Sequence, residues 1–108
     1  MLTHSNPLLE VFPLEDGRGV RLVGELCLST VGDLAALLDS LPERAEVLDL
    51  ADLSFMDSSG LHAFERYARR GSRPLVIENA SAPVRRMFEI TGAHLDPHIE
   101  LRSDGDHG

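Results

Sequence analysis

Short apolar segments typical of β-strands alternate with segments of helical periodicity along this chain, and this alternation constrains the fold more than any other feature. Strand patterns cover residues 8–15, 19–26, 46–50, 74–77 and 99–102, and helical patterns begin at Thr30, Gly60 and Ser81. Strands that are separated by helices need crossover connections, so most of the sheet is expected to be parallel. The predicted fold class is therefore α/β, a mixed β-sheet with an N-terminal hairpin, βαβ crossovers and helices mainly on one side.

The first two strand patterns predict a β-hairpin. They flank Asp16-Gly17-Arg18, and an Asp-Gly pair between two apolar segments favours a tight turn. Pro13 has no N–H to donate to a neighbouring strand, which places the first strand at an edge of the sheet.

Local signals indicate where the helices begin and end. Thr30-Val31-Gly32-Asp33 has the form of a capping box, and Pro42 ends the helix that follows. Gly71 is expected to cap the second helix at its C-terminus. The third helix is expected to open at Ser81-Ala82-Pro83 and to end before Gly92.

The 108 residues allow one compact domain, expected at 8–102, and a polar tail at 103–108 that is expected to be mobile. No apolar run approaches the roughly 20 residues needed to span a bilayer, so no membrane insertion is expected. The single cysteine, Cys27, cannot form an internal disulfide and favours a reducing compartment. These features predict a cytoplasmic protein. We further expect a monomer or weak dimer without a cofactor, although the sequence itself leaves the oligomeric state open.

The charge of the chain argues against several classes of function. A formal net charge of −8 opposes binding to nucleic acid, whose affinity for proteins comes largely from Lys and Arg contacts. All ten basic residues are arginines. Without lysine, the chain has no Walker-type phosphate contact and no Schiff-base chemistry. His4, His94, His98 and His107 have no spacing typical of a metal site, so no metal is expected.

The segment Asp57-Ser58-Ser59-Gly60-Leu61 lies between a predicted strand and a predicted helix. Backbone N–H groups at a helix N-terminus have no helical acceptor, and the peptide dipoles add partial positive charge there. From composition alone, Ser58 or Ser59 is most simply an N-cap residue. The same geometry also accommodates a phosphoserine.

Several segments resemble the STAS domains, in particular the bacterial anti-sigma factor antagonists. The central match is Val47-Leu48-Asp49-Leu50 followed by Leu53-Ser54-Phe55-Met56-Asp57-Ser58-Ser59-Gly60-Leu61. Gly24-Glu25-Leu26 with Thr30, and residues 82–92, match the flanking segments of that family. The resemblance covers most of residues 8–102 and implies a STAS-like version of the mixed sheet.

The resemblance implies a function and a set of partners. In that family an anti-sigma factor that is a serine kinase phosphorylates the serine after the aspartate, here Ser58, with Ser59 as second choice. A metal-dependent serine/threonine phosphatase removes the phosphate, and only the unphosphorylated antagonist binds the anti-sigma factor. The implied partner-binding residues are Asp57, Ser58, Ser59, Gly60, Leu61 and His62. The alternative is a STAS scaffold subunit of a transporter or signalling complex that is not phosphorylated.

Two other interpretations of the same segment fit less well. The nucleophile elbow of serine hydrolases needs glycine two residues before and two after the serine, and Met56 or Asp57 occupies the first position. A receiver domain with Asp57 or Asp49 as phosphoacceptor needs clustered acids for Mg²⁺ and a lysine, which this chain lacks. The protein is therefore predicted not to be an enzyme.

Overall fold

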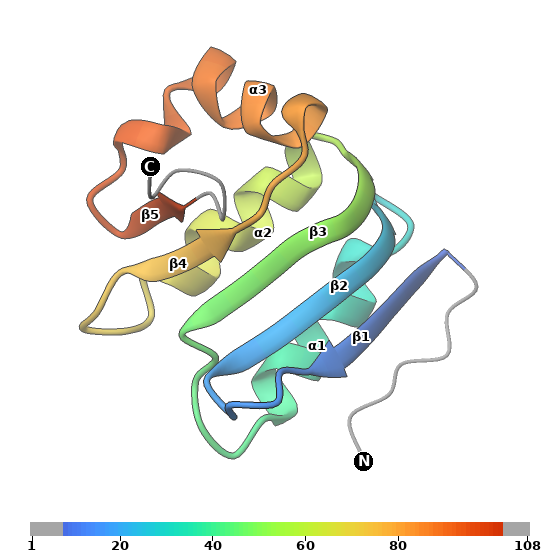
Figure 1. The fold of residues 1–108 in the computed structure, drawn as a ribbon, viewed down its shortest axis with the longest axis vertical. Coiled ribbons are helices and arrows are strands. Elements are labelled where there is room, and N and C mark those ends of the chain that lie inside the picture. Colours follow the sequence, from blue (N-terminus) through green and yellow to red (C-terminus); the bar gives the residue numbers. More distant parts are fainter. Residues whose placement is uncertain (1–7, 103–108) are drawn as a thin grey trace.

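A computed structural model describes residues 8–102, which form a five-stranded mixed sheet in the order β1-β2-β3-β4-β5 (Figure 1). The elements are β1 (Leu9–Pro13), β2 (Gly19–Leu26), α1 (Val31–Ser40), β3 (Val47–Met56), α2 (Ser58–Ala68), β4 (Leu75–Glu78), α3 (Ala82–Thr91), the 3₁₀ turn η1 (Ala93–Leu95) and β5 (Ile99–Arg102). β1 is antiparallel to β2, and every later pairing is parallel. The predicted fold class is confirmed, whereas the tail at 103–108 lies outside the described residues.

The hairpin forms at the predicted turn. Gly17 has φ +76°, a left-handed conformation that glycine adopts without steric cost. The Arg18 backbone N–H donates to Asp16 Oδ1 at 3.0 Å, and its Nε donates to Oδ2 at 2.9 Å. Among the strands of residues 8–102, β1 pairs only with β2, so the strand that contains Pro13 lies at the edge of this sheet, as predicted.

Strand β3 is longer than the predicted 46–50. It runs from Val47 to Met56 and stays paired with β2 to its end, through two register shifts that resemble β-bulges. The sequence pattern failed because exposed residues in the second half of the strand, such as Asp52 and Ser54, interrupt the apolar run. As a result, β3 leads directly into Asp57.

One predicted helix boundary is wrong, and one predicted capping hydrogen bond does not form. Thr30 is the N-cap residue of α1, as predicted, but its side chain makes no capping hydrogen bond. Instead, Thr30 Oγ1 donates to the Glu25 carbonyl at 3.1 Å and accepts from the Cys27 N–H at 3.0 Å, so it organises the preceding loop. Helix α2 ends at Ala68 with Arg69 as its C-cap, so the predicted C-cap Gly71 lies two residues beyond the observed one.

The boundaries of α3 agree with the prediction. Ser81 is its N-cap residue, and proline lies in the first turn. Gly92 closes the helix with φ +79°, the left-handed conformation expected of a C-terminal glycine.

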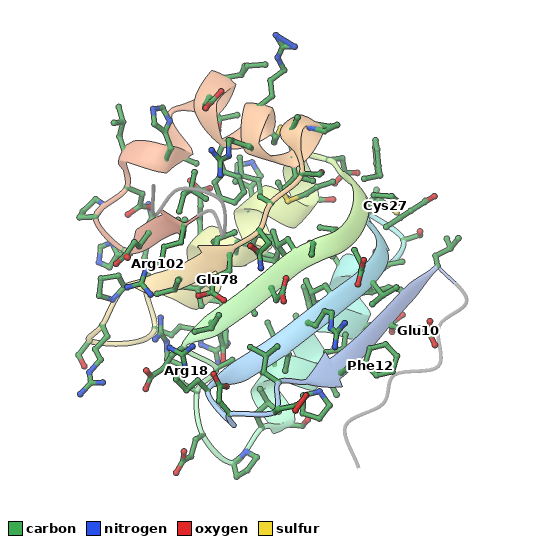
Figure 2. The ribbon with its side chains drawn as sticks, in the orientation of Figure 1. Glu10, Phe12, Arg18, Cys27, Glu78 and Arg102 are labelled. Atoms are coloured by element: carbon green, nitrogen blue, oxygen red, sulfur yellow. The ribbon has the colours of Figure 1, made fainter. Side chains whose placement is uncertain are left out.

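The core lies on one side of the sheet. In Figure 1, α1 and α2 lie behind the strands, and α3 joins the same core through the stacked rings of Phe64 and Phe88, whose centroids are 6.4 Å apart. Figure 2 looks onto the opposite side, where charged residues such as Glu10, Glu78 and Arg102 are at least partly exposed. Within residues 8–102, no helix combines the length and the apolar character needed to cross a membrane.

We predict that Gly24→Ala destabilises the protein by more than about 1 kcal/mol. Gly24 has φ +117°, and a Cβ there would lie 2.2 Å from the backbone oxygen of Leu8, so both conformation and space exclude a side chain. Urea denaturation measures the change. Gly32→Ala is the matched control, because a Cβ at Gly32 meets no atom within 4 Å and alanine favours the helix. Equal stability of the two variants would contradict this account.

Candidate functional site

The candidate site lies where β3 ends and α2 begins. Met56, the last residue of β3, and Leu61, in the first turn of α2, are both buried. Gly60 fits between them and β2, since a Cβ there would lie 2.8 Å from Leu26 Cγ and 2.9 Å from Met56 Cγ. This close packing fixes the N-terminus of α2 against the ends of two neighbouring strands.

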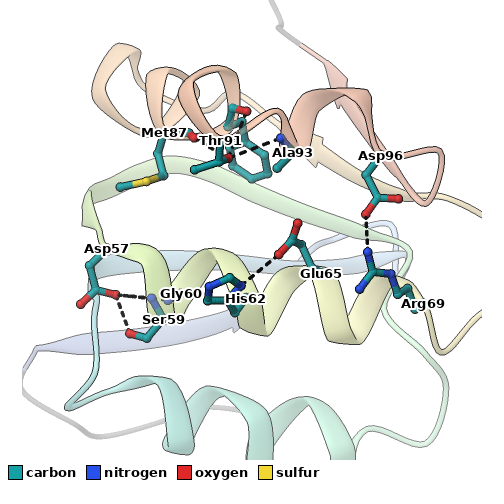
Figure 3. A network of polar contacts seen from close by, with 11 residues as sticks. Asp57, Ser59, Gly60, His62, Glu65, Arg69, Met87, Thr91, Ala93 and Asp96 are labelled. Atoms are coloured by element: carbon teal, nitrogen blue, oxygen red, sulfur yellow. Dashed lines mark hydrogen bonds and ion pairs between the residues drawn. The ribbon is translucent and has the colours of Figure 1, made fainter.

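The carboxylate of Asp57 is the central hydrogen-bond acceptor of the site (Figure 3). Its Oδ1 accepts hydrogen bonds from the Ser59 N–H at 3.0 Å, the Gly60 N–H at 3.2 Å and the Ser59 hydroxyl at 2.5 Å. Its Oδ2 accepts from the Leu28 N–H at 3.2 Å. Because these bonds favour the ionised form, the Ser59 hydroxyl above all, the pKa of Asp57 is below its ordinary value.

Asp57 is therefore the N-cap of α2, which corrects the expectation that Ser58 or Ser59 has this role. The Asp57 backbone is extended, at φ −104° and ψ −174°, so its side chain turns back over the first helical N–H groups. A carboxylate in this position also interacts favourably with the positive end of the helix dipole. Both serines lie inside the helix, as its first and second residues.

The two serines differ in what their hydroxyls contact. Ser59 is half-buried, and its hydroxyl is held by Asp57. Ser58 is exposed, and its hydroxyl makes no hydrogen bond to another residue within 8–102. An incoming enzyme would reach the Ser58 hydroxyl without breaking a bond of the folded protein, whereas it would have to displace Asp57 at Ser59.

The other predicted partner-binding residues have different positions. His62 is exposed one turn along α2, and its Nδ1 lies 3.1 Å from Glu65 Oε1 (Figure 3). Gly60 and Leu61 are buried beneath the helix start. The structure thus brings Asp57, Ser58, Ser59 and His62 to the surface or partly to it, with Gly60 and Leu61 as support.

The β2–α1 loop, residues 27–30, belongs to the same site, and its role was not predicted. It meets the site through the bond from Leu28 N–H to Asp57, two residues that are 29 positions apart in the sequence. Thr30 is fully buried, and its hydroxyl fixes the loop. Cys27 Sγ lies 3.2 Å from Ser29 Oγ, and hydrogen bonds from Ser29, more than from Thr30, lower the pKa of the thiol. No local pattern reveals a contact of this range, although Thr30 was part of the family resemblance.

The described part of the chain contains no group of three or more His, Cys, Asp or Glu side chains that could hold a metal ion.

A protein-family model described as "Mlab, STAS domain" matches residues 14–99, a range that contains Asp57 and both serines. The chain belongs to the STAS domain family. Among its relatives is an anti-sigma-B factor antagonist of Staphylococcus epidermidis, 33% identical over 92 residues that cover 78% of this chain and 83% of the relative. The same protein from two strains of that species matches equally well. This STAS domain is therefore similar to anti-sigma factor antagonists over most of both chains.

We predict that Asp57→Ala destabilises the STAS domain by about 1–2 kcal/mol, because it leaves the N–H groups of Ser59, Gly60 and Leu28 without their acceptor. The measurement is urea denaturation at neutral pH. Asp52→Ala is the control: Asp52 forms an exposed ion pair with Arg21 at 3.7 Å, and its loss should cost less than about 0.5 kcal/mol. An Asp57→Ala effect no larger than that of Asp52→Ala would contradict the role of Asp57 as cap.

The lowered pKa of Asp57 makes a separate prediction about pH. The folded protein favours the ionised form of this carboxylate more than the unfolded chain does. The ionised carboxylate therefore stabilises the fold fully above its pKa in the unfolded chain, about 4. This stabilisation is lost as the pH falls through the lower pKa of the folded protein. The difference in free energy of unfolding between wild type and Asp57→Asn should therefore shrink below about pH 4. If this difference in free energy of unfolding stayed constant from pH 7 to pH 3, the charge of Asp57 would not contribute to the stability of the fold.

Proposed function

We propose that this STAS domain is an anti-sigma factor antagonist that is switched by phosphorylation of Ser58. The observation that carries the proposal is the contrast between the two serines. Ser58 is exposed and its hydroxyl has no hydrogen-bond partner among residues 8–102, while the Ser59 hydroxyl is bonded to Asp57. The named relatives, which are anti-sigma-B factor antagonists, supply the class of partner.

The position of Ser58 explains how one phosphate could change binding and leave the fold intact. A phosphate adds about −1.5 to −2 charge and three acceptor oxygens. At the first residue of α2 the helix dipole stabilises that charge within the modified protein. At an interface, however, the dianion would have to be desolvated beside the Asp57 carboxylate, on a chain of net charge −8. Phosphorylation is thus expected to oppose docking of the partner.

The proposed partners are an anti-sigma factor that is a serine kinase, which binds the unphosphorylated form, and a metal-dependent serine/threonine phosphatase. Ser58 and His62 offer direct contacts, and Gly60 and Leu61 hold the helix start from beneath. We place this exchange in the cytoplasm, where the protein is the substrate of the two enzymes and has no activity of its own.

The site of modification can be tested directly. We predict that incubation with ATP, Mg²⁺ and the cognate anti-sigma kinase from the same genome adds one phosphate, which mass spectrometry of peptides places on Ser58. Ser59→Ala should still be phosphorylated and Ser58→Ala should not. Modification at Ser59 alone would overturn the choice between the two serines.

The charge mechanism has its own test in a binding assay. Ser58→Ala should bind the anti-sigma factor about as tightly as wild type, whereas Ser58→Asp should bind at least about tenfold more weakly, since like charge at an interface is costly. Ser59→Asp is not a suitable comparison because it also disturbs the Asp57 cap. Equal affinity of Ser58→Ala and Ser58→Asp would count against the switch.

If no candidate anti-sigma factor binds or phosphorylates the wild-type protein, the alternative function takes precedence. The domain would then be a STAS scaffold subunit of a transporter or signalling complex, with Asp57 and its bonded serine as structural groups.

A further inference from the structure

Large apolar side chains are exposed at two places in the described part of the chain. Leu8, Leu28 and Phe55 lie at the end of the sheet where β2 and β3 finish, which is also the end that carries Ser58. Ile90 and Leu95 lie at the end of α3 and in η1. Single exposed apolar residues are common on protein surfaces and need no explanation. A group of large exposed apolar residues beside a candidate modification site indicates an interaction surface.

Leu28 is held beside Ser58 by the backbone. Its N–H donates to Asp57 Oδ2 at 3.2 Å, and Asp57 is the residue directly before Ser58. The loop around it is fixed from below by the buried hydroxyl of Thr30. Leu28 is nevertheless 78% exposed, so a backbone held by hydrogen bonds presents an apolar residue to solvent.

Phe55 approaches the same place from β3. It is two residues before Asp57, and its strand partner on β2 is Glu25, three residues before Leu28. Because Met56 points into the core and side chains alternate along a strand, the Phe55 ring points to the open side of the sheet, where it is 49% exposed. Leu28 and Phe55, called the apolar pair below, thus lie on the two segments that flank Asp57.

We propose that the apolar pair anchors the anti-sigma factor on this protein. The inference rests on the proposed function: a kinase that transfers phosphate to Ser58 must bring its active site to the Ser58 hydroxyl. A stable interface covers about 800 Å² on each partner, so a footprint centred on Ser58 includes the neighbouring loop and strand end. Leu28 and Phe55 are the large exposed apolar groups on the two segments next to Asp57, and docking would remove them from water, which is the main source of affinity at interfaces.

In this proposal, control of docking and binding affinity come from different residues of the site. Phosphorylation of Ser58 adds the negative charge that opposes docking. The apolar pair supplies binding affinity when Ser58 is not phosphorylated. Asp57 links the two, since the same carboxylate caps the helix of Ser58 and holds the backbone of Leu28.

The test measures binding of the unphosphorylated protein to the anti-sigma kinase by titration calorimetry. Leu28→Ala and Phe55→Ala are each expected to weaken binding roughly tenfold, as truncation of a buried interface anchor does. The matched control is Leu95→Ala, because Leu95 is 76% exposed, close to the 78% of Leu28, but lies in η1. It should bind as wild type does. Urea denaturation of all three variants should show that the fold is retained.

The possible results separate this inference from the proposed function. If wild type binds and the Leu28→Ala and Phe55→Ala variants bind equally well, the apolar pair is not the anchor, although the antagonist function stands. If Leu95→Ala weakens binding as much as the others do, the surface is not centred on Ser58 and the inference is wrong. If wild type binds no anti-sigma factor, the proposed function fails and the inference fails with it.

Discussion

The carboxylate of Asp57 connects three parts of the structure: the end of β3, the start of α2 and the β2–α1 loop. It follows directly on β3, caps α2 through the N–H groups of Ser59 and Gly60, and holds the β2–α1 loop through Leu28. Four hydrogen bonds to one ionised group are each stronger than bonds between neutral partners. The exposure of Ser58, the bonding of Ser59 and the position of Leu28 all depend on this arrangement.

The architecture explains why these groups meet at one end of the sheet. β2 and β3 are parallel, so their C-terminal ends lie at the same edge, and the segments that follow them begin side by side. Ligand sites of open parallel sheets commonly lie at this edge. The hydrophobic core between the sheet and the helices, with Phe64 and Phe88 stacked within it, supports the surface groups of the candidate site.

Local sequence signals were reliable where a single residue type imposes its own geometry. Asp16-Gly17 formed the hairpin turn, Pro13 lay in an edge strand and Gly92 ended α3, because glycine and proline restrict or widen backbone choice wherever they occur. The signals failed where a side chain had several possible partners. Thr30 is the N-cap residue of α1, but its hydroxyl bonds to the loop before the helix and not to the first helical N–H groups. The prediction at Gly71 failed in a different way, because α2 had already ended at Ala68.

The sequence by itself determined the α/β class, the mixed sheet, and the strand-to-helix junction at Asp57 with two serines after it, since periodicity and turn residues act locally. Only the tertiary structure decided that Asp57 is the cap and that Leu28 lies beside it. It also decided that, within the described part of the chain, the Ser59 hydroxyl is bonded and the Ser58 hydroxyl is not. The physical reason is that hydrogen bonds depend on distances in space. The bond between Leu28 and Asp57 spans 29 positions of sequence and exists because parallel pairing brings the ends of β2 and β3 together.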